Sequence, residues 1–541
     1  MRSARWMTVV ILLGLLVVSG GTSRDTCEVK LSLVEDGTGK ELPGLIRVTD
    51  SSGTVIEIPE LFSRGTGLPG EEPLRDWYVL PGSRTIRLPR QSVKIEAFSG
   101  LETERTSRTL DLSGQDSRVV QLSLIRFHDS RASGQVAGNT HLHLMKLTRE
   151  ECDRYLREVP HTDGLDVVFL SYLERADADR DYISNRYTRG DLERLERDSG
   201  VLFGNGEEHR HNFSGFNQGY GHVMLLNIQR LILPVSIGPG IMKTGTDGLP
   251  LERGIRQARK DGATVVWCHN AWGREDVPNF VSGRVDAQNI FDGGNHGSYE
   301  DSFYRYLNAG IPVAFSTGTD WFMYDFSRVY VPAAQGSGVQ GWLRKLAAGQ
   351  STITNGPLLE LSVNGRQPGE MVSLAHPGNV QIAARGRGRA DFGKIELVRN
   401  GQVISSAPSR RVGGHWEAAL DFEFELLIPQ PCWLALRIPP VEDPAESAAV
   451  RRKRAGEPGR NEAGRPLFAH TGAVQVELGG RRHFDPRAGA ALLADMAESL
   501  REIGETAQFA DPQERARVLD VYRDGMAALK RHIAQCEKKI E

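Results

Sequence analysis

Two histidines one residue apart, His141 and His143, have the spacing of a metal-binding pair. On a β-strand, side chains at positions i and i+2 point to the same face, so both imidazoles can reach one cation. Imidazole nitrogen is a ligand for zinc, iron, nickel and copper. The pair comes after residues 133–139, whose two glycines predict a turn. Because His-x-His also occurs by chance on strands, a metal site needs further ligands from later segments of the chain.

Four more ligand-type residues lie next to apolar runs that predict strands. They are Glu208 after the run 201–203 and a Gly-Asn-Gly turn at 204–206, His222 before 223–226, His269 after 264–267, and Asp320 after 312–315. In an α/β barrel the carboxyl ends of the strands line one mouth, where active sites form. Each residue also has a purely structural interpretation, such as a core histidine, a helix cap or a solvated carboxylate. Together they predict segments that converge on a metal centre.

In this order the segments resemble the PHP-type metal-dependent hydrolases, and within them they look most like the CehA/McbA (carbaryl-hydrolase-like) family. The resemblance covers roughly residues 130–360. Its motifs are His141-x-His143, Gly206-x-Glu208, Gly221-His222, the strand end at His269, Gly318-Thr319-Asp320 and the junction Thr354-Asn355-Gly356-Pro357. It implies a distorted seven-stranded β/α barrel with up to three divalent metals. The activity it implies is hydrolysis of phosphoesters or, in this branch, of carbamate or amide bonds.

Two positions depart from the PHP pattern. Residues 171–174 replace an Asp-His pair after the second barrel strand, and Phe322 replaces the histidine of a final Asp-x-His. Both changes remove metal ligands, so we expect one or two divalent ions, with zinc as first choice and manganese or iron as alternatives. The expected ligands are His141, His143, Glu208, His222, His269 and Asp320. Glu208 is preferred to Glu207 because it has the Gly-x-Glu spacing, and His209, His211 and His296 are expected to support the ligands or lie at the surface.

The chemistry we expect is attack by metal-activated water on an amide, carbamate, ester or phosphoester bond, since a metal with an open position lowers the pKa of bound water to about 7. The predicted catalytic residues are Glu208 as a bridging or charge-balancing carboxylate, Asp320 as ligand and proton acceptor, and His269 as ligand or proton donor. Trp272 and Arg274, in the loop after His269, are predicted to bind substrate by stacking and by pairing with an anion. Polar cover is the structural alternative for this loop.

A hypothesis of a different class is a catalytically inactive secreted protein that binds carbohydrate or a cell-surface ligand on a degenerate barrel. The two missing ligand positions and the flanking β-rich segments favour it. A serine hydrolase is not expected, because the chain has no Gly-x-Ser-x-Gly motif. The two hypotheses differ in whether the protein holds a metal.

The 541 residues have the composition of a folded protein, with 39% hydrophobic residues, 25% charged residues and a net charge of −3. This charge and the absence of a nucleic-acid motif predict no nucleic-acid partner, and the expected partner is a small-molecule or polymer substrate. Oligomeric state stays open. Arg2 and Arg5 before the apolar stretch 6–18 predict a signal peptide over residues 1–23, and hence a secreted or periplasmic protein, with an uncleaved membrane anchor as the alternative. Once the signal is removed, no stable membrane span is expected.

Hydrophobic periodicity divides the rest of the chain. Apolar residues alternate with polar ones in residues 24–128 and 358–482, which predicts two β modules. The second is predicted to be a sandwich with a hairpin at Asn400-Gly401 and a strand over 420–426. Its charged segment 441–466 is predicted to be a solvated loop. Strand and helix patterns alternate in 129–357, the predicted barrel. Residues 483–541 predict a helical hairpin with caps at Asp485 and Asp511. The predicted fold class is a multidomain α/β plus all-β protein, with a distorted (β/α)7 PHP-like barrel flanked by the two β modules.

Overall fold

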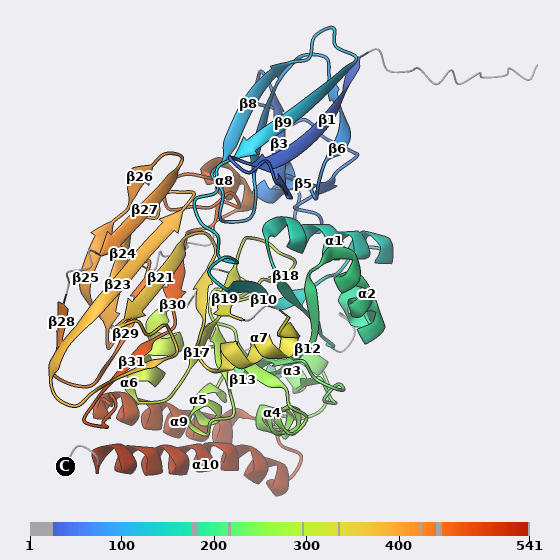
Figure 1. Ribbon diagram of the computed structural model, residues 1–541. Helices are drawn as coiled ribbons and strands as arrows, with labels where there is room; N and C mark the ends of the chain where they lie inside the picture. Colours follow the sequence, from blue (N-terminus) through green and yellow to red (C-terminus); the bar gives the residue numbers. More distant parts are fainter. Residues whose placement is uncertain are drawn as a thin grey trace, which may run out of the picture.

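The computed structural model is a mixed α/β protein with large sheets and, in the described part of the chain, ten α-helices (Figure 1). The structure describes residues 25–175, 182–214, 218–294, 297–333, 336–420, 425–439 and 446–538. The predicted signal peptide, His296 and most of the predicted strand over 420–426 lie outside these ranges. No helix within them has the length and apolar character that crossing a membrane requires.

The N-terminal β segment forms two small sheets, drawn in blue in Figure 1. The four-stranded sheet contains β1 (Thr26–Glu35), β2 (Glu41–Leu42), β6 (Arg84–Pro89) and β9 (Ser117–Leu124), and the five-stranded sheet contains β3 (Gly44–Asp50), β4 (Phe62–Ser63), β5 (Tyr78–Leu80), β7 (Ser92–Phe98) and β8 (Thr106–Asp111). The alternating apolar residues of β1, β7 and β9 are buried in one shared core. The strands predicted from that alternation are therefore confirmed.

The central part of the chain alternates strands and helices, but its sheet is only partly parallel. Its strands are β10 (Gln135–His143), β11 (Val167–Tyr172), β12 (Leu202–Asn212), β13 (Gln218–Leu226), β14 (Ser236–Ile237), β15 (Thr264–Cys268), β16 (Ala287–Asn289), β17 (Ala314–Ser316) and β18 (Asp320–Trp321). β10, β11 and β12 run parallel, as do β15, β16 and β17, and β18 pairs back onto β10. β13 lies antiparallel to both β12 and β15. The predicted alternation of strand and helix is thus interrupted at β13, which pairs antiparallel with the preceding strand.

Helices cover this central sheet in the positions that periodicity predicts. In α4 (Leu251–Lys260) the residues Leu251, Ile255 and Ala258 are buried with β13 and β15 in one core. The other helices of this part are α1 (Arg149–Asp163), α2 (Arg189–Ser199), α3 (Pro239–Met242), α5 (Asp276–Val281), a π-helical turn at Glu300–Tyr304 that leads into α6 (Arg305–Asn308), and α7 (Gly338–Ala347). α1 and α2 both begin with a threonine capping box.

Of the two glycine-rich stretches that predicted turns, 133–139 is a turn only as far as Gly134, and 204–206 lies entirely within a strand. β10 already begins at Gln135, so Gly138 is a strand residue, and a Cβ there would lie 2.5 Å from Cζ2 of Trp342. Gly204 lies within β12, where a Cβ would be 2.5 Å from the ring of Phe169. These glycines give aromatic rings room to pack on the sheet, which is the other common reason for a glycine in a strand.

The second β segment packs two sheets around a shared core. One sheet contains β21 (Leu358–Val363), β23 (Gly378–Gly388), β26 (Arg410–Val412), β27 (His415–Leu420) and β28 (Glu425–Ile428). The other continues from the central sheet through β19 (Arg328–Pro332) and β20 (Thr352–Thr354) into β22 (Met371–Leu374), β24 (Lys394–Arg399), β25 (Gln402–Pro408), β29 (Cys432–Arg437), β30 (Ala469–Thr471) and β31 (Val474–Leu478). The predicted hairpin at Asn400-Gly401 is confirmed, because Arg399 pairs with Gln402 and both turn residues have positive φ.

The charged segment after β29 is not the solvated loop that its composition predicted. Within its described residues, α8 (Ala448–Arg454) packs against the N-terminal β segment. Arg451 is buried and forms an ion pair with Glu72, and Arg452 lies 2.9 Å from Asp76. Ion pairs with a distant part of the chain thus hold this basic run in place.

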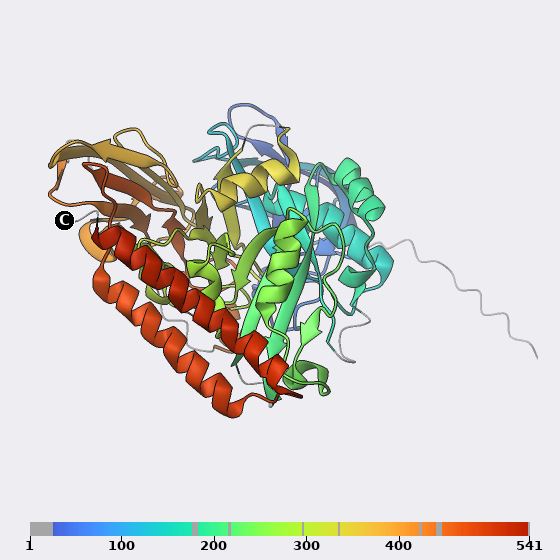
Figure 2. The same cartoon turned by 90° about the horizontal axis from the view of Figure 1, so that it is seen from below.

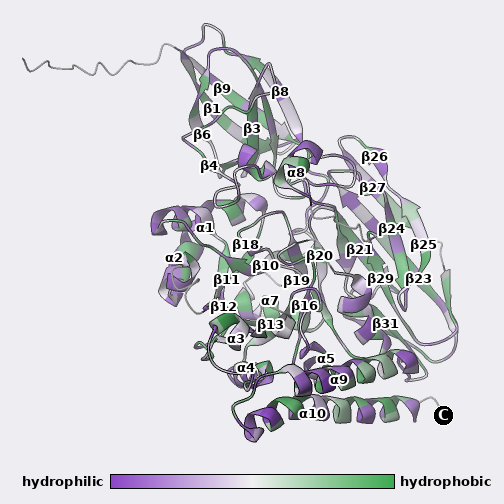
Figure 3. Cartoon of the chain, turned by 180° about the vertical axis from the view of Figure 1, so that it is seen from behind, coloured by the Kyte–Doolittle hydropathy of each residue, from purple (hydrophilic) through white to green (hydrophobic). Residues whose placement is uncertain are grey.

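The predicted C-terminal helical hairpin is confirmed as α9 (Pro486–Thr506) and α10 (Pro512–Glu537), which run side by side along one face of the molecule (Figure 2). Asp485 and Asp511 cap the two helices as expected, each accepting a hydrogen bond from a first-turn N–H. Apolar and polar residues alternate along both helices in Figure 3. The apolar stripe is buried, and Gly525 of α10 lies directly against Pro278 of α5.

Candidate metal centre

The two histidines of β10 meet at the carboxyl end of that strand. His141 and His143 are fully buried, and their Nε2 atoms are 2.9 Å apart. Nδ1 of His143 donates to the backbone carbonyl of Ser171, 3.0 Å away, which leaves the lone pair on Nε2. Nδ1 of His141 lies 2.7 Å from Oδ2 of Asp292. Metal-binding histidines are usually held in this way, with the other ring nitrogen bonded to a carbonyl or a carboxylate.

Glu208 of β12 lies between two sets of imidazoles. Its Oε2 is 3.1 Å from Nε2 of His143, and its Oε1 is 3.1 Å from Nδ1 of His222 and 3.6 Å from Nε2 of His269. Asp320, at the start of β18, places Oδ1 3.4 Å from Nε2 of His141. A carboxylate whose two oxygens face different groups of ligands is suited to bridge two cations.

The structure brings all six predicted ligands together in overlapping groups. Within each group the ligand atoms lie no more than 4.8 Å from one another. The first group is His141, His143, Glu208 and Asp320, and the second is Glu208, His222 and His269. The third group is His141, Cys268, His269 and Asp292. Nitrogen and carboxylate oxygen donors in this arrangement could hold a divalent metal ion.

Several buried ligand atoms of this cluster lack a hydrogen-bond partner among the described residues. They are Oε1 of Glu208, Nδ1 of His222, Nδ1 of His269, Oδ1 of Asp292 and Oδ1 of Asp320. Buried polar atoms are nearly always paired, and a bound ion is one of the recognised reasons for an exception. The donor set therefore fits a metal with mixed imidazole and carboxylate ligands.

The electrostatics of the cluster keep two carboxylates ionised. Burial alone would raise the pKa of Glu208, but Arg210 and the surrounding histidines hold it well below its usual range. Burial also opposes ionisation of Asp292, whose pKa is nevertheless lowered by His141 and His269. In Asp320 burial outweighs the nearby imidazoles and raises the pKa. Ionised carboxylates beside imidazoles attract a cation, which must displace any proton from the rings, so metal binding here depends on pH.

Strand alternation in β12 separates the residues of the site from their neighbours. Glu208, Arg210 and Asn212 share one face: Nη1 of Arg210 is 3.4 Å from Oε2 of Glu208, and Oδ1 of Asn212 accepts a hydrogen bond from Nε2 of His222 at 3.0 Å. The second bond leaves the lone pair of His222 on Nδ1, the atom that faces Glu208. Burial and Arg210 together lower the pKa of His222, which favours this neutral form.

The other face of β12 carries Glu207, His209 and His211 away from the cluster. Glu207 pairs with Nδ1 of His209 at 2.9 Å and accepts the backbone N–H of Ile232 at 2.7 Å. His211 pairs with Asp247 at 3.0 Å. The geometry thus places Glu208, and not Glu207, in the cluster. The two extra histidines are buried structural groups and do not lie at the surface.

Four residues of the site were not found from the sequence. Asp292 follows β16, a short strand without an apolar run to signal it, and Asn289 of that strand donates to its Oδ2 at 2.9 Å. Cys268 was not among the predicted ligands; burial raises its pKa, which keeps it protonated without a metal. Arg210 and Asn212 could have been found, because they follow Glu208 at the two-residue period of a strand.

The predicted substrate residues lie at different distances from the cluster. The half-buried ring of Trp272 packs edge-to-face on His222, with centroids 4.5 Å apart. Arg274 forms an ion pair with Glu502 of α9 at 2.7 Å, which ties its loop to the helical hairpin. Contact of either side chain with substrate stays a prediction.

The two positions that depart from the PHP pattern have structural roles here. Phe322 is buried in a core cluster, where its ring packs against Tyr155. Ser171 contributes its backbone carbonyl to the orientation of His143. Asp292 supplies a carboxylate that the sequence motifs did not include. In comparisons with known proteins, the chain matches no family model and no curated sequence.

Proposed function

We propose that this protein is a metal-dependent hydrolase of the PHP type, similar to the CehA/McbA family, with β10 to β18 as a distorted barrel. The observation that carries the proposal is the position of Glu208, whose two oxygens face His143 on one side and His222 and His269 on the other. The pairing of β18 back onto β10 supports the barrel. The signal-like residues 1–23 support action in a secreted or periplasmic setting.

The roles of the residues follow from their positions. His141, His143 and Asp320 would hold one divalent cation, His222 and His269 a second, and Glu208 would join the two. A bound cation would supply water activated at neutral pH for attack on a carbonyl or phosphoryl centre. Asp320, whose pKa is raised by burial, would be placed to accept a proton from that water. If Glu208 and His222 alone held the second cation, the partly exposed His269 would instead be free to donate a proton to the leaving group.

One observation favours the alternative of a metal-free binding protein. The final histidine of the PHP pattern is replaced by Phe322, which is buried and cannot serve as a ligand. In that alternative the remaining imidazoles are a relic of a former metal site, and the protein would bind a carbohydrate or cell-surface ligand without turnover.

Metal analysis of the purified protein tests the proposal. We expect stoichiometric zinc, manganese or iron in the wild type, and loss of both metal and chelator-sensitive hydrolysis of an ester, amide, carbamate or phosphoester panel in His143→Ala. His376→Ala is the matched control, because His376 is exposed and far from the cluster in sequence. Unchanged metal content in His143→Ala, or a wild type without metal after incubation with each ion, would reject the assignment.

A further inference from the structure

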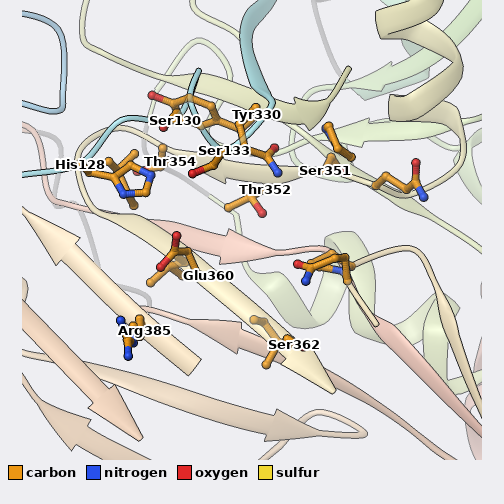
Figure 4. A pocket seen from close by; sticks show the side chains of 18 of the residues that line it. His128, Ser130, Ser133, Tyr330, Ser351, Thr352, Thr354, Glu360, Ser362 and Arg385 are labelled. Carbon is orange, nitrogen blue, oxygen red and sulfur yellow. The ribbon is translucent and has the colours of Figure 1, made fainter. Parts of the chain in front are cut away.

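A cavity of about 700 Å³ lies where three parts of the chain meet, away from the metal cluster (Figure 4). The segment that follows β9 contributes His128, Ser130 and Ser133 to its rim. One wall belongs to β19 and β20, through which the central sheet continues, and the other to the second β segment. Its volume is within the range of small-molecule sites, roughly 300–1,000 Å³, and junctions between parts of a protein are where such sites tend to form.

The two walls are sheet faces that do not fill the space between them. On the central sheet, Tyr330 of β19 pairs with Thr352 of β20. On the second β segment, Glu360 and Ser362 of β21 pair with Arg385 and Ala383 of β23. Figure 4 shows Tyr330 and Thr352 across the cavity from Glu360 and Ser362.

Facing sheets normally lie about 10 Å apart, with interdigitating apolar side chains between them. Here the apolar residues Leu359 and Leu361 of β21 belong to the core on the other side of their sheet. Most of the side chains that face the cavity are short or polar, so packing leaves it open.

The lining has the chemistry of a site for a neutral, hydroxyl-rich ligand. The side chains of Gln135, Gln350, Thr352, Ser362 and Gln367 form no hydrogen bond with the part of the chain that the structure describes. Hydroxyl and amide groups both donate and accept, as sugar hydroxyls do. Glu360 is paired with Arg387 at 3.0 Å, so its charge is already compensated. Leu358, Pro332 and the ring of Tyr330 add apolar surface for the C–H faces of sugar rings.

The cavity and the metal cluster are separate sites. Gln135, which lines the cavity, begins β10, and His143 ends it. Eight residue steps of about 3.3 Å place the two about 26 Å apart along the strand. A ligand in the cavity therefore does not present its reacting bond to the cluster unless it is a long polymer.

We propose that this cavity binds a neutral oligosaccharide. The binding does not depend on the metal cluster, so it holds whether or not the proposed hydrolase activity is found. An extended peptide is the competing occupant. Hydroxyl and amide side chains outnumber the ionisable ones of His128, Glu360 and Arg385 in the lining, which favours sugar over peptide.

Calorimetric titration of the full chain tests this proposal. The probes are maltotriose, cellotriose, xylotriose and mannotriose, with an uncharged pentapeptide of alanine as the competing ligand. We expect at least one sugar to bind the wild type. In Ser362→Trp the dissociation constant of that sugar should rise roughly tenfold or more, because the indole fills the cavity. Thr352→Val removes one hydroxyl at nearly constant shape and is expected to weaken binding roughly three- to tenfold. Ser406→Trp is the matched control, since Ser406 is exposed on β25 of the same β segment.

Metal content measured on the same samples separates this result from the test of the hydrolase. Sugar binding that is lost in Ser362→Trp and kept in Ser406→Trp supports the site, whatever the metal content. If no sugar binds the folded wild type, if binding survives in both Ser362→Trp and Thr352→Val, or if only the peptide binds, the proposal is wrong.

Discussion

Adjacent residues of β12 have opposite roles because a strand sends them to opposite faces. Glu208 lies among the imidazoles, whereas Glu207 bonds to His209 and to the backbone of Ile232. The chemical type is the same, and only the face of the strand distinguishes the two carboxylates. Substitution of Glu208 should therefore affect metal binding, whereas substitution of Glu207 should affect stability.

We expect Glu208→Gln to lose metal while it keeps its fold, because its amide cannot supply the bridging charge. Glu207→Ala should keep metal but lose on the order of 2 kcal/mol of stability, because it leaves a buried N–H and a buried imidazole without their acceptor. Metal analysis and urea unfolding of both variants measure this contrast. Equal metal loss in the two variants would contradict the assignment of the faces.

Arg210 is a second residue whose position suggests a function. Its side chain is largely buried, it lies 3.4 Å from Glu208, and its Nε has no hydrogen-bond partner among the described residues. A guanidinium recognises oxyanions with several donors at once. Arg274, by contrast, is already paired with Glu502.

We expect Arg210→Met to weaken inhibition of hydrolysis by inorganic phosphate roughly tenfold, the effect of losing one charged hydrogen bond. Arg274→Met is the comparison, and it should change the inhibition constant little. A larger effect in Arg274→Met would show that the loop after His269 provides the anion contact.

At the scale of elements, the loop between β17 and β18 must approach β10 closely to place Asp320. Gly318 makes this approach possible, because a Cβ there would lie 2.5 Å from Cβ of His141 and 3.0 Å from its backbone nitrogen. The loop carries Asp320 and the strand carries His141 and His143. A methyl group added at position 318 would push the loop and the strand apart, and with them these predicted ligands.

Gly318→Ala is expected to lower metal affinity roughly tenfold, since a small displacement of well-placed ligands is costly. Its secondary structure should not change. The control is Gly190→Ala in α2, where the added methyl meets no atom closer than 4.0 Å. Competition with a chelating dye measures both affinities, and an unchanged affinity in Gly318→Ala would show that the loop can move without consequence.

At the scale of the whole molecule, buried polar contacts join the separate parts of the chain. Arg64 of the N-terminal β segment is fully buried, pairs with Asp163 of α1 at 2.6 Å and donates to the carbonyls of Met323 and Asp325. His470 of β30 accepts a hydrogen bond from Tyr304 and donates to the carbonyl of Thr471, each at 2.7 Å. His470 lies where the central sheet continues into the second β segment.

His470 makes this junction sensitive to acid. Burial lowers its pKa from 6.5 to about 3. Between pH 6.5 and pH 3 the ring therefore stays neutral in the folded protein but takes up a proton in the unfolded chain. The contribution of the neutral buried ring to stability is complete above pH 6.5 and declines as the pH falls toward 3.

Between pH 7 and pH 5 the wild type should lose about 2 kcal/mol through this residue alone. His470→Gln should be less stable than the wild type at pH 7, because it loses the buried hydrogen bonds. Its stability should not fall between pH 7 and pH 5 through this position, because glutamine does not titrate. Urea unfolding at the two pH values should show the difference between wild type and variant shrinking by that amount. A constant difference would mean that another group, and not His470, governs the acid response of the junction.

Features set by neighbouring residues could be predicted from the sequence. The strands with alternating apolar residues, the Asn400-Gly401 hairpin, the capped helices α9 and α10 and the shared face of His141 and His143 all follow from backbone geometry over a few positions. Several mistakes had the same cause: the glycines at 138 and 204 and the basic run at 451–454 have local patterns typical of turns and loops. Their actual roles depend on partners far away in sequence, Trp342, Phe169 and Glu72.

The sequence by itself determined which residue types were present to bind a cation and at what spacing two of them lie. Only the tertiary structure decided that Asp292 joins them, that Glu207 turns away, and that two polar sheet faces leave a cavity open. The physical reason is that periodicity is a property of a single strand or helix. Convergence depends on strand register and on loops that bring together residues separated by more than a hundred positions.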